Sequence, residues 1–390
     1  MQINKPENTL QNISVGSKEI NAARVAFFLP GFVISTWAPM IPMVKARLKL
    51  EADVLGLLLL CIGISAFIFM PLAGALVQRF GCKKVVITGA TLMALISVLL
   101  SCLPNIWSYA IALAFFGAVM GATDVSMNTN AVIVEKLAGR RLLSGMHAFW
   151  SIGCFASAGL FSVLASSGSN VTLIAKLHCA IVLALLAVFG RHLLDYKIPG
   201  GEKAFAIPRG IVIVLGILAC ISFLVEGAVM DWSGVLLTEV KNMDIALAGT
   251  GYAIFSVAML IMRLLGDKTV QFLGEQKAVI GGSIVTAAGF ALVVVLDNLY
   301  LNAFAFILIG LGCANIVPVF YSLLKYQKGM PISAAVTSVT SLGYTGVILG
   351  PALLGFVAHG INISAVFELV ALLLVIEAGI AKYVFCKLKM

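Results

Sequence analysis

The chain has 390 residues, of which 61% are hydrophobic and 11% are charged, and its formal net charge is +9. A soluble globular protein could not remove this much apolar surface from water, so the composition excludes that class and predicts an all-α polytopic membrane protein. The excess of basic residues fits either nucleic-acid binding or the basic loops of a membrane protein, and their distribution along the chain separates the two.

Residues 1–21 are polar and contain no apolar core of the kind a signal peptide has, so we expect a cytoplasmic tail there. Twelve apolar segments follow, each close to the ~20 residues with which a helix crosses a bilayer. They lie at 22–45, 54–78, 84–103, 107–134, 144–166 and 171–191 in the first half, and at 211–237, 245–265, 277–297, 301–324, 332–358 and 364–386 in the second.

The stretch 192–210 separates the two sets of segments. It contains two prolines, two adjacent glycines and mixed charge, which is typical of a linker. The sequence therefore predicts twelve transmembrane helices in two six-helix bundles, at 22–191 and 211–386, with a short cytoplasmic tail at 387–390.

Lysine and arginine residues gather in alternate loops of this arrangement. With both termini in the cytoplasm, 21 of the 26 lie on the cytoplasmic side and 5 on the outer side. This asymmetry is what the positive-inside rule describes, so it predicts cytoplasmic termini. It also argues against a nucleic acid as partner and leaves the lipid bilayer as the expected surroundings.

Short motifs recur in the two halves at a nearly constant spacing. Four of them occur in order, with offsets of 195, 193, 191 and 190 residues, which together indicate duplication although each match is weak alone. The pairs are Trp37 with Trp232, Gly81 with Gly274, Asp124 with Asn315, and Ser151-Ile-Gly153 with Ser341-Leu-Gly343. Many transporters consist of two such repeats and hold their substrate near the middle of the membrane.

The most polar membrane segment begins at Gly121 and places Asp124, Asn128 and two further polar side chains inside an apolar run. On a helix Asp124 and Asn128 lie about 40° apart and so share one face. A polar face in a membrane is costly unless it lines a water-filled path or a binding cavity. We interpret this face as the inner wall of a transporter.

The loop after the second span reads Gly74-Ala-Leu-Val-Gln-Arg79-Phe-Gly81-Cys-Lys83-Lys84. It resembles the G-x-L-A-D-R-x-G-R-K signature of the major facilitator superfamily, with Gly74, Arg79, Gly81 and Lys83 in place and Gln78 at the acidic position. The resemblance implies gating loops here and at the second-half counterpart, which contains Arg263, Gly266 and Asp267.

The chain is also similar over nearly its whole length to fucose-permease-like bacterial inner-membrane transporters. This resemblance implies that Asp124 takes part in proton coupling and substrate binding, and that His147 and Trp150 stand at sugar-contacting positions. The acid that those relatives carry in the first span is missing from this chain, which argues against fucose itself as substrate.

Individual residues support two expected roles. A carboxylate in an apolar cavity favours its protonated form and an imidazole titrates near neutrality, so the candidate proton-coupling residues are Asp124, His147 and Glu226. Amides orient polar solutes and aromatic rings can stack on a sugar, although each of these side chains could instead serve helix packing. The candidate substrate-binding residues are Trp37, Asn128, His147, Trp150, Glu226, Asn315 and Tyr344.

We therefore expect a monomeric secondary transporter in the bacterial inner membrane that moves a small polar solute, such as a sugar, together with protons. An exporter of metabolites or amphiphilic drugs by proton antiport is the alternative, and a sensor built on a transporter fold is a third possibility. The four histidines lie in separate segments, and we find no nucleophile cluster, metal set or cofactor motif. An enzyme, a metal site and a cofactor are therefore not expected.

Overall fold

The computed structural model describes residues 15–37, 40, 44, 47–49, 52–197, 207–243 and 250–388. Most of the predicted N-terminal tail, residues 198–206 of the predicted linker and residues 389–390 lie outside this part of the chain. The described residues divide into two compact units. The first comprises residues up to Ile207, with Met330–Thr337 added, and the second comprises the rest from Pro208 onward, with Leu143–Gly145 added.

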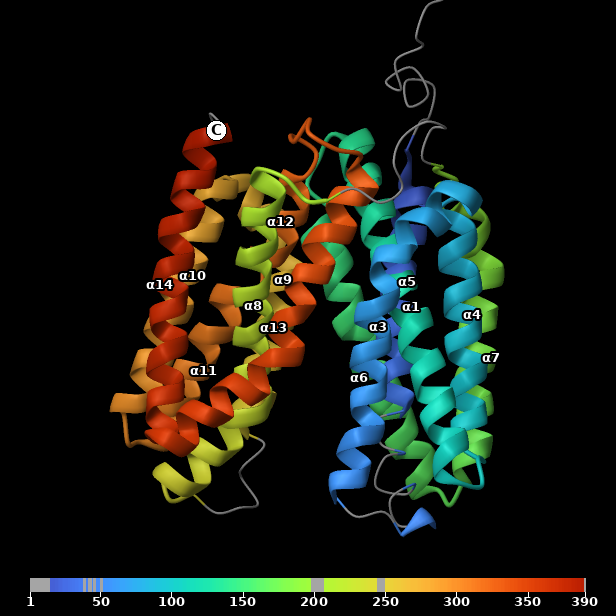
Figure 1. The fold of residues 1–390 in the computed structure, drawn as a ribbon, viewed down its shortest axis with the longest axis horizontal. Helices are drawn as coiled ribbons and strands as arrows, with labels where there is room; N and C mark the ends of the chain where they lie inside the picture. Colours follow the sequence, from blue (N-terminus) through green and yellow to red (C-terminus); the bar gives the residue numbers. More distant parts are fainter. Residues whose placement is uncertain are drawn as a thin grey trace, which may run out of the picture. The chain divides into compact units, whose positions relative to one another are not determined.

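The first unit contains six long helices, one for each predicted span of the first half (Figure 1). They are α1 (Ser17–Trp37), α3 (Ala52–Phe80), α4 (Cys82–Leu100), α5 (Ile106–Ala138), α6 (Leu143–Ser166) and α7 (Val171–Phe189), followed by the short 3₁₀ turn η2 (Gly190–His192). Helix α1 begins five residues before the predicted start at residue 22. Helix α5 packs against α1, α3 and α4 and forms the centre of this unit.

The second unit repeats this pattern with one interruption. It contains α8 (Ile211–Val235), the π-turn η3 (Leu236–Val240), α9 (Thr250–Leu273), α10 (Glu275–Val295), α11 (Leu299–Cys313), α12 (Ile316–Leu323), α13 (Ile332–Gly360) and α14 (Ile363–Leu388). Helices α11 and α12 together form one predicted span, 301–324, which the sequence led us to expect as a single helix. Within this unit α10 packs against α9, α11 and α14.

Eleven helical segments in the described part of the chain are long and apolar enough to cross a membrane, with α11 and α12 counted together. Helix α9, which carries Arg263, Asp267 and Lys268, is not among the eleven, but its 24 residues span about 36 Å. The predicted all-α polytopic fold is confirmed.

The backbone supports the duplication inferred from sequence. Gly81, between α3 and α4, has φ 87° and ψ 153°, and its counterpart Gly274, between α9 and α10, has φ 81° and ψ 155°. A side chain at this positive φ would be strained, which explains why both turns carry glycine. The two halves therefore connect their second and third spans by the same turn.

The repeats differ at the fourth span. In the first half α5 runs unbroken past Asp124, whereas the corresponding span of the second half stops at Cys313 and resumes at Ile316. Pro318 explains the break, because proline has no N–H to donate to the carbonyl four residues earlier, at Ala314. Its counterpart at the 191-residue offset is Met127, which leaves α5 continuous.

Candidate functional site

Asp124 lies near the middle of the longest helix of the first unit. Helix α5 is 33 residues long, so Asp124 lies about 27 Å from its start in a helix of about 50 Å. The side chain is only 8% exposed. Among the described residues, no hydrogen bond or ion pair reaches its carboxylate. A buried carboxyl group without a partner is costly in its charged form, which makes this position chemically unusual.

Asn128 is the second polar side chain of this face with an unused group. Its amide nitrogen donates to the Asp124 carbonyl at 2.9 Å, and its Oδ1 has no hydrogen-bond partner among the described residues. The hydroxyls of Ser126 and Thr129 donate instead to carbonyls of their own helix, each at 2.7 Å. Asp124 and Asn128 therefore lie one turn apart on α5 with groups that can still bind a ligand, and the Oδ1 of Asn130 on another side of the helix is also without a partner among the described residues.

Two predicted residues of α6 lie against α1. The His147 ring meets the Phe27 ring edge-on with centroids 4.9 Å apart, and Trp150 is half-buried. The helices approach closely because Gly31 faces the Trp150 backbone and Gly153 faces the backbone of Phe28. The backbone of α6 that carries His147 and Trp150 thus lies in close contact with α1.

Trp37 does not join this group. It is buried at the end of α1, and its ring lies 6.3 Å from that of Tyr109 near the start of α5. Tyr109 stands fifteen residues before Asp124, which corresponds to about 22 Å along the helix. A small substrate at Asp124 would not reach Trp37, so these positions argue against one shared contact, and a substrate-binding role of Trp37 stays a prediction.

In the second unit Glu226 of α8 forms an ion pair with Arg263 of α9, with Oε1 and the guanidinium 3.0 Å apart. Arg263 also donates from Nε to the Ala314 carbonyl at 3.3 Å. In a continuous helix this carbonyl would accept from the backbone N–H of residue 318, but Pro318 has no N–H to donate. One arginine thus links α8, α9 and the break between α11 and α12.

Asn315 stands directly at this break. It is buried, and its Oδ1 has no hydrogen-bond partner among the described residues. Gly266 of α9 lies against this amide, so that a side chain there would collide with it. Tyr344 of α13 packs edge-on against Phe223, which lies about one turn before Glu226 on α8, with ring centroids 5.9 Å apart.

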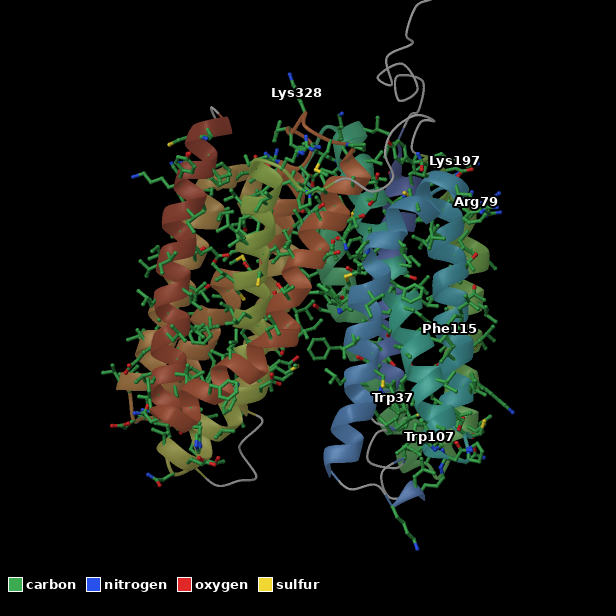
Figure 2. All side chains as sticks on the ribbon, in the orientation of Figure 1. Trp37, Arg79, Trp107, Phe115, Lys197 and Lys328 are labelled. Atoms are coloured by element: carbon green, nitrogen blue, oxygen red, sulfur yellow. The ribbon has the colours of Figure 1, made fainter. Side chains whose placement is uncertain are left out.

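The residues expected in gating loops occupy several kinds of structure. Gly74 and Arg79 lie within α3, Gly81 forms the turn, and Lys83 in α4 donates from Nζ to the Arg191 carbonyl at 2.7 Å. Figure 2 shows Arg79 and Lys197 near the same end of this unit. Their gating role stays a prediction.

In the second-half motif, Asp267 accepts from the Gly145 backbone N–H at 3.3 Å; both residues belong to the second unit. Arg263, in contrast, is not in a loop. It is buried within α9, ten residues before the helix end, and pairs with Glu226.

Sequence reasoning missed two buried polar groups. Glu377 of α14 is fully buried and accepts hydrogen bonds from Ser222 at 2.6 Å and Ser283 at 3.2 Å. His178 of α7 is also buried, with its ring nitrogens 2.9 and 3.2 Å from the carbonyls of Ile174 and Ser157. An acid inside an apolar span could have indicated Glu377 from the sequence. Its partners Ser222 and Ser283 could not be identified in this way, because they lie far from it in sequence.

In the described part of the chain, eleven helical segments able to cross a membrane, together with α9, form two repeated halves with buried carboxyl, amide and guanidinium groups inside them, as in a multi-pass membrane transporter. The sequence model of the Major Facilitator Superfamily matches residues 25–344, and the chain belongs to that family. This membership identifies a transporter of small molecules rather than an enzyme.

Among curated proteins, the chain is 40% identical over 375 residues to an uncharacterised MFS-type transporter of Yersinia pestis, covering 96% of this chain and 98% of the relative. It is 24% identical over 381 residues to Multidrug resistance protein 2 of Bacillus subtilis, covering 91% of each. Among solved structures, the fucose:proton symporter FucP of E. coli matches with a TM-score of 0.75 and 15% identity, covering 94% of this chain and 98% of FucP.

Proposed function

We propose that this protein is a proton-coupled symporter that moves a small polar solute, a sugar or a related metabolite, by alternating access. Asp124 is its protonation site. The observation that carries the proposal is a carboxyl group at mid-length of a membrane-spanning helix with no partner among the described residues. A carboxylate that lacks a fixed cation can take up and release a proton as its exposure to water changes.

The groups nearest to Asp124 along its helix suit a polar solute better than an apolar one. The free Oδ1 of Asn128 can accept from a hydroxyl, and Asn315 offers the same group in the second unit. A site with hydrogen-bonding groups discriminates against ligands that cannot pair with them. The name of the structural neighbour FucP, a fucose:proton symporter, agrees with this substrate class and with proton coupling.

The Glu226–Arg263 pair supplies a second charged element. Its carboxylate is 27% exposed while the guanidinium is 10% exposed, so Glu226 is the partner that a solute can reach. We assign Glu226 to substrate binding and Arg263 to holding it in place. His147 and Trp150 remain proposed substrate contacts, and Tyr344 and Trp37 are peripheral in this proposal.

Export by proton antiport is the alternative, and the relationship to Multidrug resistance protein 2 favours it. In that case Asp124 and Glu226 would bind cationic or amphiphilic drugs instead of a neutral polar solute. Both versions place the protein in the bacterial inner membrane with both termini in the cytoplasm and acting as a monomer.

Thermal stabilisation of the purified protein by candidate substrates separates the two versions. A ligand that binds the native state raises the apparent melting temperature by mass action. The panel comprises sugars, sugar acids, amino acids and hydrophobic cations, each measured at two pH values. Stabilisation by a polar solute that depends on pH supports symport, whereas stabilisation by hydrophobic cations alone would overturn it in favour of export.

A further inference from the structure

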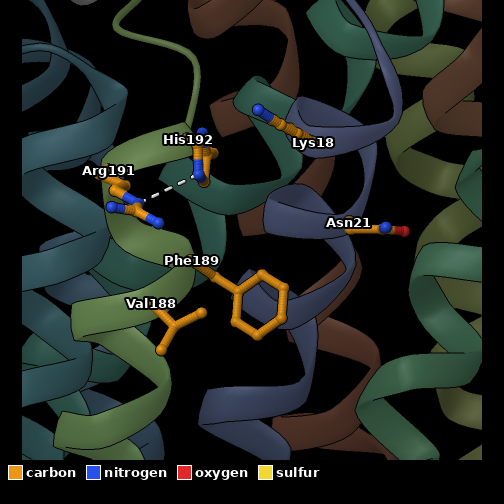
Figure 3. Close-up of a pocket in the computed structure, with 6 residues that line it drawn as sticks. All are labelled: Lys18, Asn21, Val188, Phe189, Arg191 and His192. Carbon is orange, nitrogen blue, oxygen red and sulfur yellow. Dashed lines mark hydrogen bonds between the residues drawn. The ribbon is translucent and has the colours of Figure 1, made fainter.

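A cavity of about 450 Å³ lies in the first unit between the beginning of α1 and the end of α7 (Figure 3). This volume falls within the range of roughly 300–1,000 Å³ that is common for ligand sites. Its lining residues are Lys18 and Asn21 from α1, Val188 and Phe189 from α7, and Arg191 and His192 from η2. The cavity has no part in the proposed transport site.

Three basic side chains line this cavity, and they outnumber the one acid that interacts with them. Within the described part of the chain, none of Lys18, Arg191 and His192 forms an ion pair with a carboxylate. The nearest acid in sequence, Glu19, accepts from the backbone N–H of Gly16 at 2.8 Å and interacts electrostatically with Lys18 and His192 without forming an ion pair with either. The unbalanced positive charge makes the cavity suitable for an anion.

The basic groups are held in place by local hydrogen bonds. Arg191 donates from Nε to Nε2 of His192 at 3.1 Å, as the dashed line in Figure 3 marks. Lys83 of α4 donates to the Arg191 carbonyl at 2.7 Å and so fixes the 3₁₀ turn after α7. A positive-inside bias alone would leave such residues spread along the loops, whereas these come from two separate segments and meet at one cavity.

The remaining part of the cavity is apolar. Figure 3 shows the Phe189 ring and Val188 below the basic side chains, and Val188 is 53% exposed on its helix. Helix α1 starts and helix α7 ends at this level, so the cavity lies where the hydrocarbon layer gives way to the headgroup region. A ligand with an anionic head and an apolar tail matches both parts.

We propose that this cavity binds the headgroup of one anionic phospholipid. Its phosphate lies among Lys18, Arg191 and His192, and the upper part of its acyl chains lies against Val188 and Phe189. A lipid rather than a soluble anion is favoured because the cavity combines unpaired basic groups with exposed apolar side chains at the membrane boundary. The face concerned is the one expected to be cytoplasmic, where basic pockets meet anionic lipids.

The test uses the purified full-length protein in a neutral detergent. Retention of phosphatidylglycerol and of phosphatidylcholine is measured by native mass spectrometry, and the melting temperature is followed with each lipid or with inorganic phosphate. The variant Lys18→Gln/Arg191→Gln removes two charges from the cavity. The control Arg140→Gln/Lys328→Gln removes two exposed charges that do not line it.

We expect wild type and the control to retain phosphatidylglycerol in preference to phosphatidylcholine. The cavity variant should bind phosphatidylglycerol roughly thirtyfold more weakly, since each basic side chain near a membrane surface contributes about a fivefold effect and the variant removes two of them. Equal retention of phosphatidylglycerol by the two double variants would overturn the proposal. Equal retention of both lipids by wild type would do so too, as would stabilisation by inorganic phosphate that matches stabilisation by lipid.

Discussion

Arg263 donates its Nε hydrogen bond to the backbone carbonyl of Ala314, 3.3 Å away on a different helix. This carbonyl has no helical donor because Pro318 stands four residues later. The same guanidinium pairs with Glu226 at 3.0 Å, so the helix break and the ion pair depend on one side chain. Pro318 therefore leaves the Ala314 carbonyl open to Arg263, which also holds Glu226.

Replacing Pro318 by alanine restores the missing N–H and should make α11 and α12 continuous. Because proline in a helix interior costs roughly 3 kcal/mol relative to alanine, we expect the variant to be at least as stable as wild type. Transport of the identified substrate should nevertheless fall, since Arg263 loses its acceptor and Asn315 changes direction.

Melting temperature and initial uptake rate, measured together, check this prediction. Pro71→Ala in α3 is the matched control, because it also removes a proline from the inside of a helix. Full transport activity in Pro318→Ala would show that the break has no functional role.

The Glu226–Arg263 pair predicts an asymmetric response to neutral substitutions. Glu226→Gln removes the negative charge beside an arginine whose side chain is 10% exposed, whereas Arg263→Gln removes the positive charge beside a glutamate whose side chain is 27% exposed. Glu226→Gln should destabilise the protein more than Arg263→Gln does. Its cost should stay below the roughly 3–5 kcal/mol that breaking a fully buried ion pair causes. The double variant should recover part of this loss, and a melting temperature that falls additively in the double variant would contradict the assignment of the pair.

Glu377 is expected to be structural. It joins α14 to Ser222 of α8 and Ser283 of α10 by hydrogen bonds. Glu377→Ala should destabilise the second unit by about 2–5 kcal/mol through the cavity and the two unpaired hydroxyls. Glu377→Gln keeps an acceptor and should transport normally, so a loss of proton-driven uptake in this variant, at normal stability, would reveal a second coupling carboxylate.

Two glycines of α6 provide a matched pair for testing the contact between α1 and α6. A Cβ at Gly153 would lie 3.0 Å from the backbone nitrogen of Phe32 and would also collide with the Phe28 carbonyl, whereas at Gly159 it would meet nothing within 4 Å. Gly153→Ala should therefore lower the melting temperature. Gly159→Ala should leave it unchanged or raise it, by up to about 1 kcal/mol of helix propensity. Equal melting temperatures for the two variants would refute the close contact.

The sequence predicted the helices well because each apolar run is long enough to identify a span and because the loops are short. It predicted the duplication from motifs such as Gly81 and Gly274, whose backbone angles agree. It did not predict the break at Asn315, since a proline inside a long apolar segment leaves the hydropathy of that segment nearly unchanged.

The candidate site was less predictable, because its groups meet only through tertiary packing. Arg263 was placed in a gating loop by analogy with a motif, although its partner Glu226 stands 37 residues away on another helix. The partners of Glu377 are 155 and 94 residues away. Helical periodicity did identify Asp124 and Asn128 as neighbours, because that relationship is local.

The central claim, that Asp124 carries the coupling proton, is tested most directly in proteoliposomes with Asp124→Asn. Two rates are compared: accumulation of the substrate driven by a proton gradient, and exchange of labelled for unlabelled substrate without a gradient. Asp231→Asn, which changes an exposed acid of α8, is the control. We expect Asp124→Asn to lose accumulation while retaining exchange, and the control to retain both. Normal proton-driven accumulation by Asp124→Asn would contradict the account.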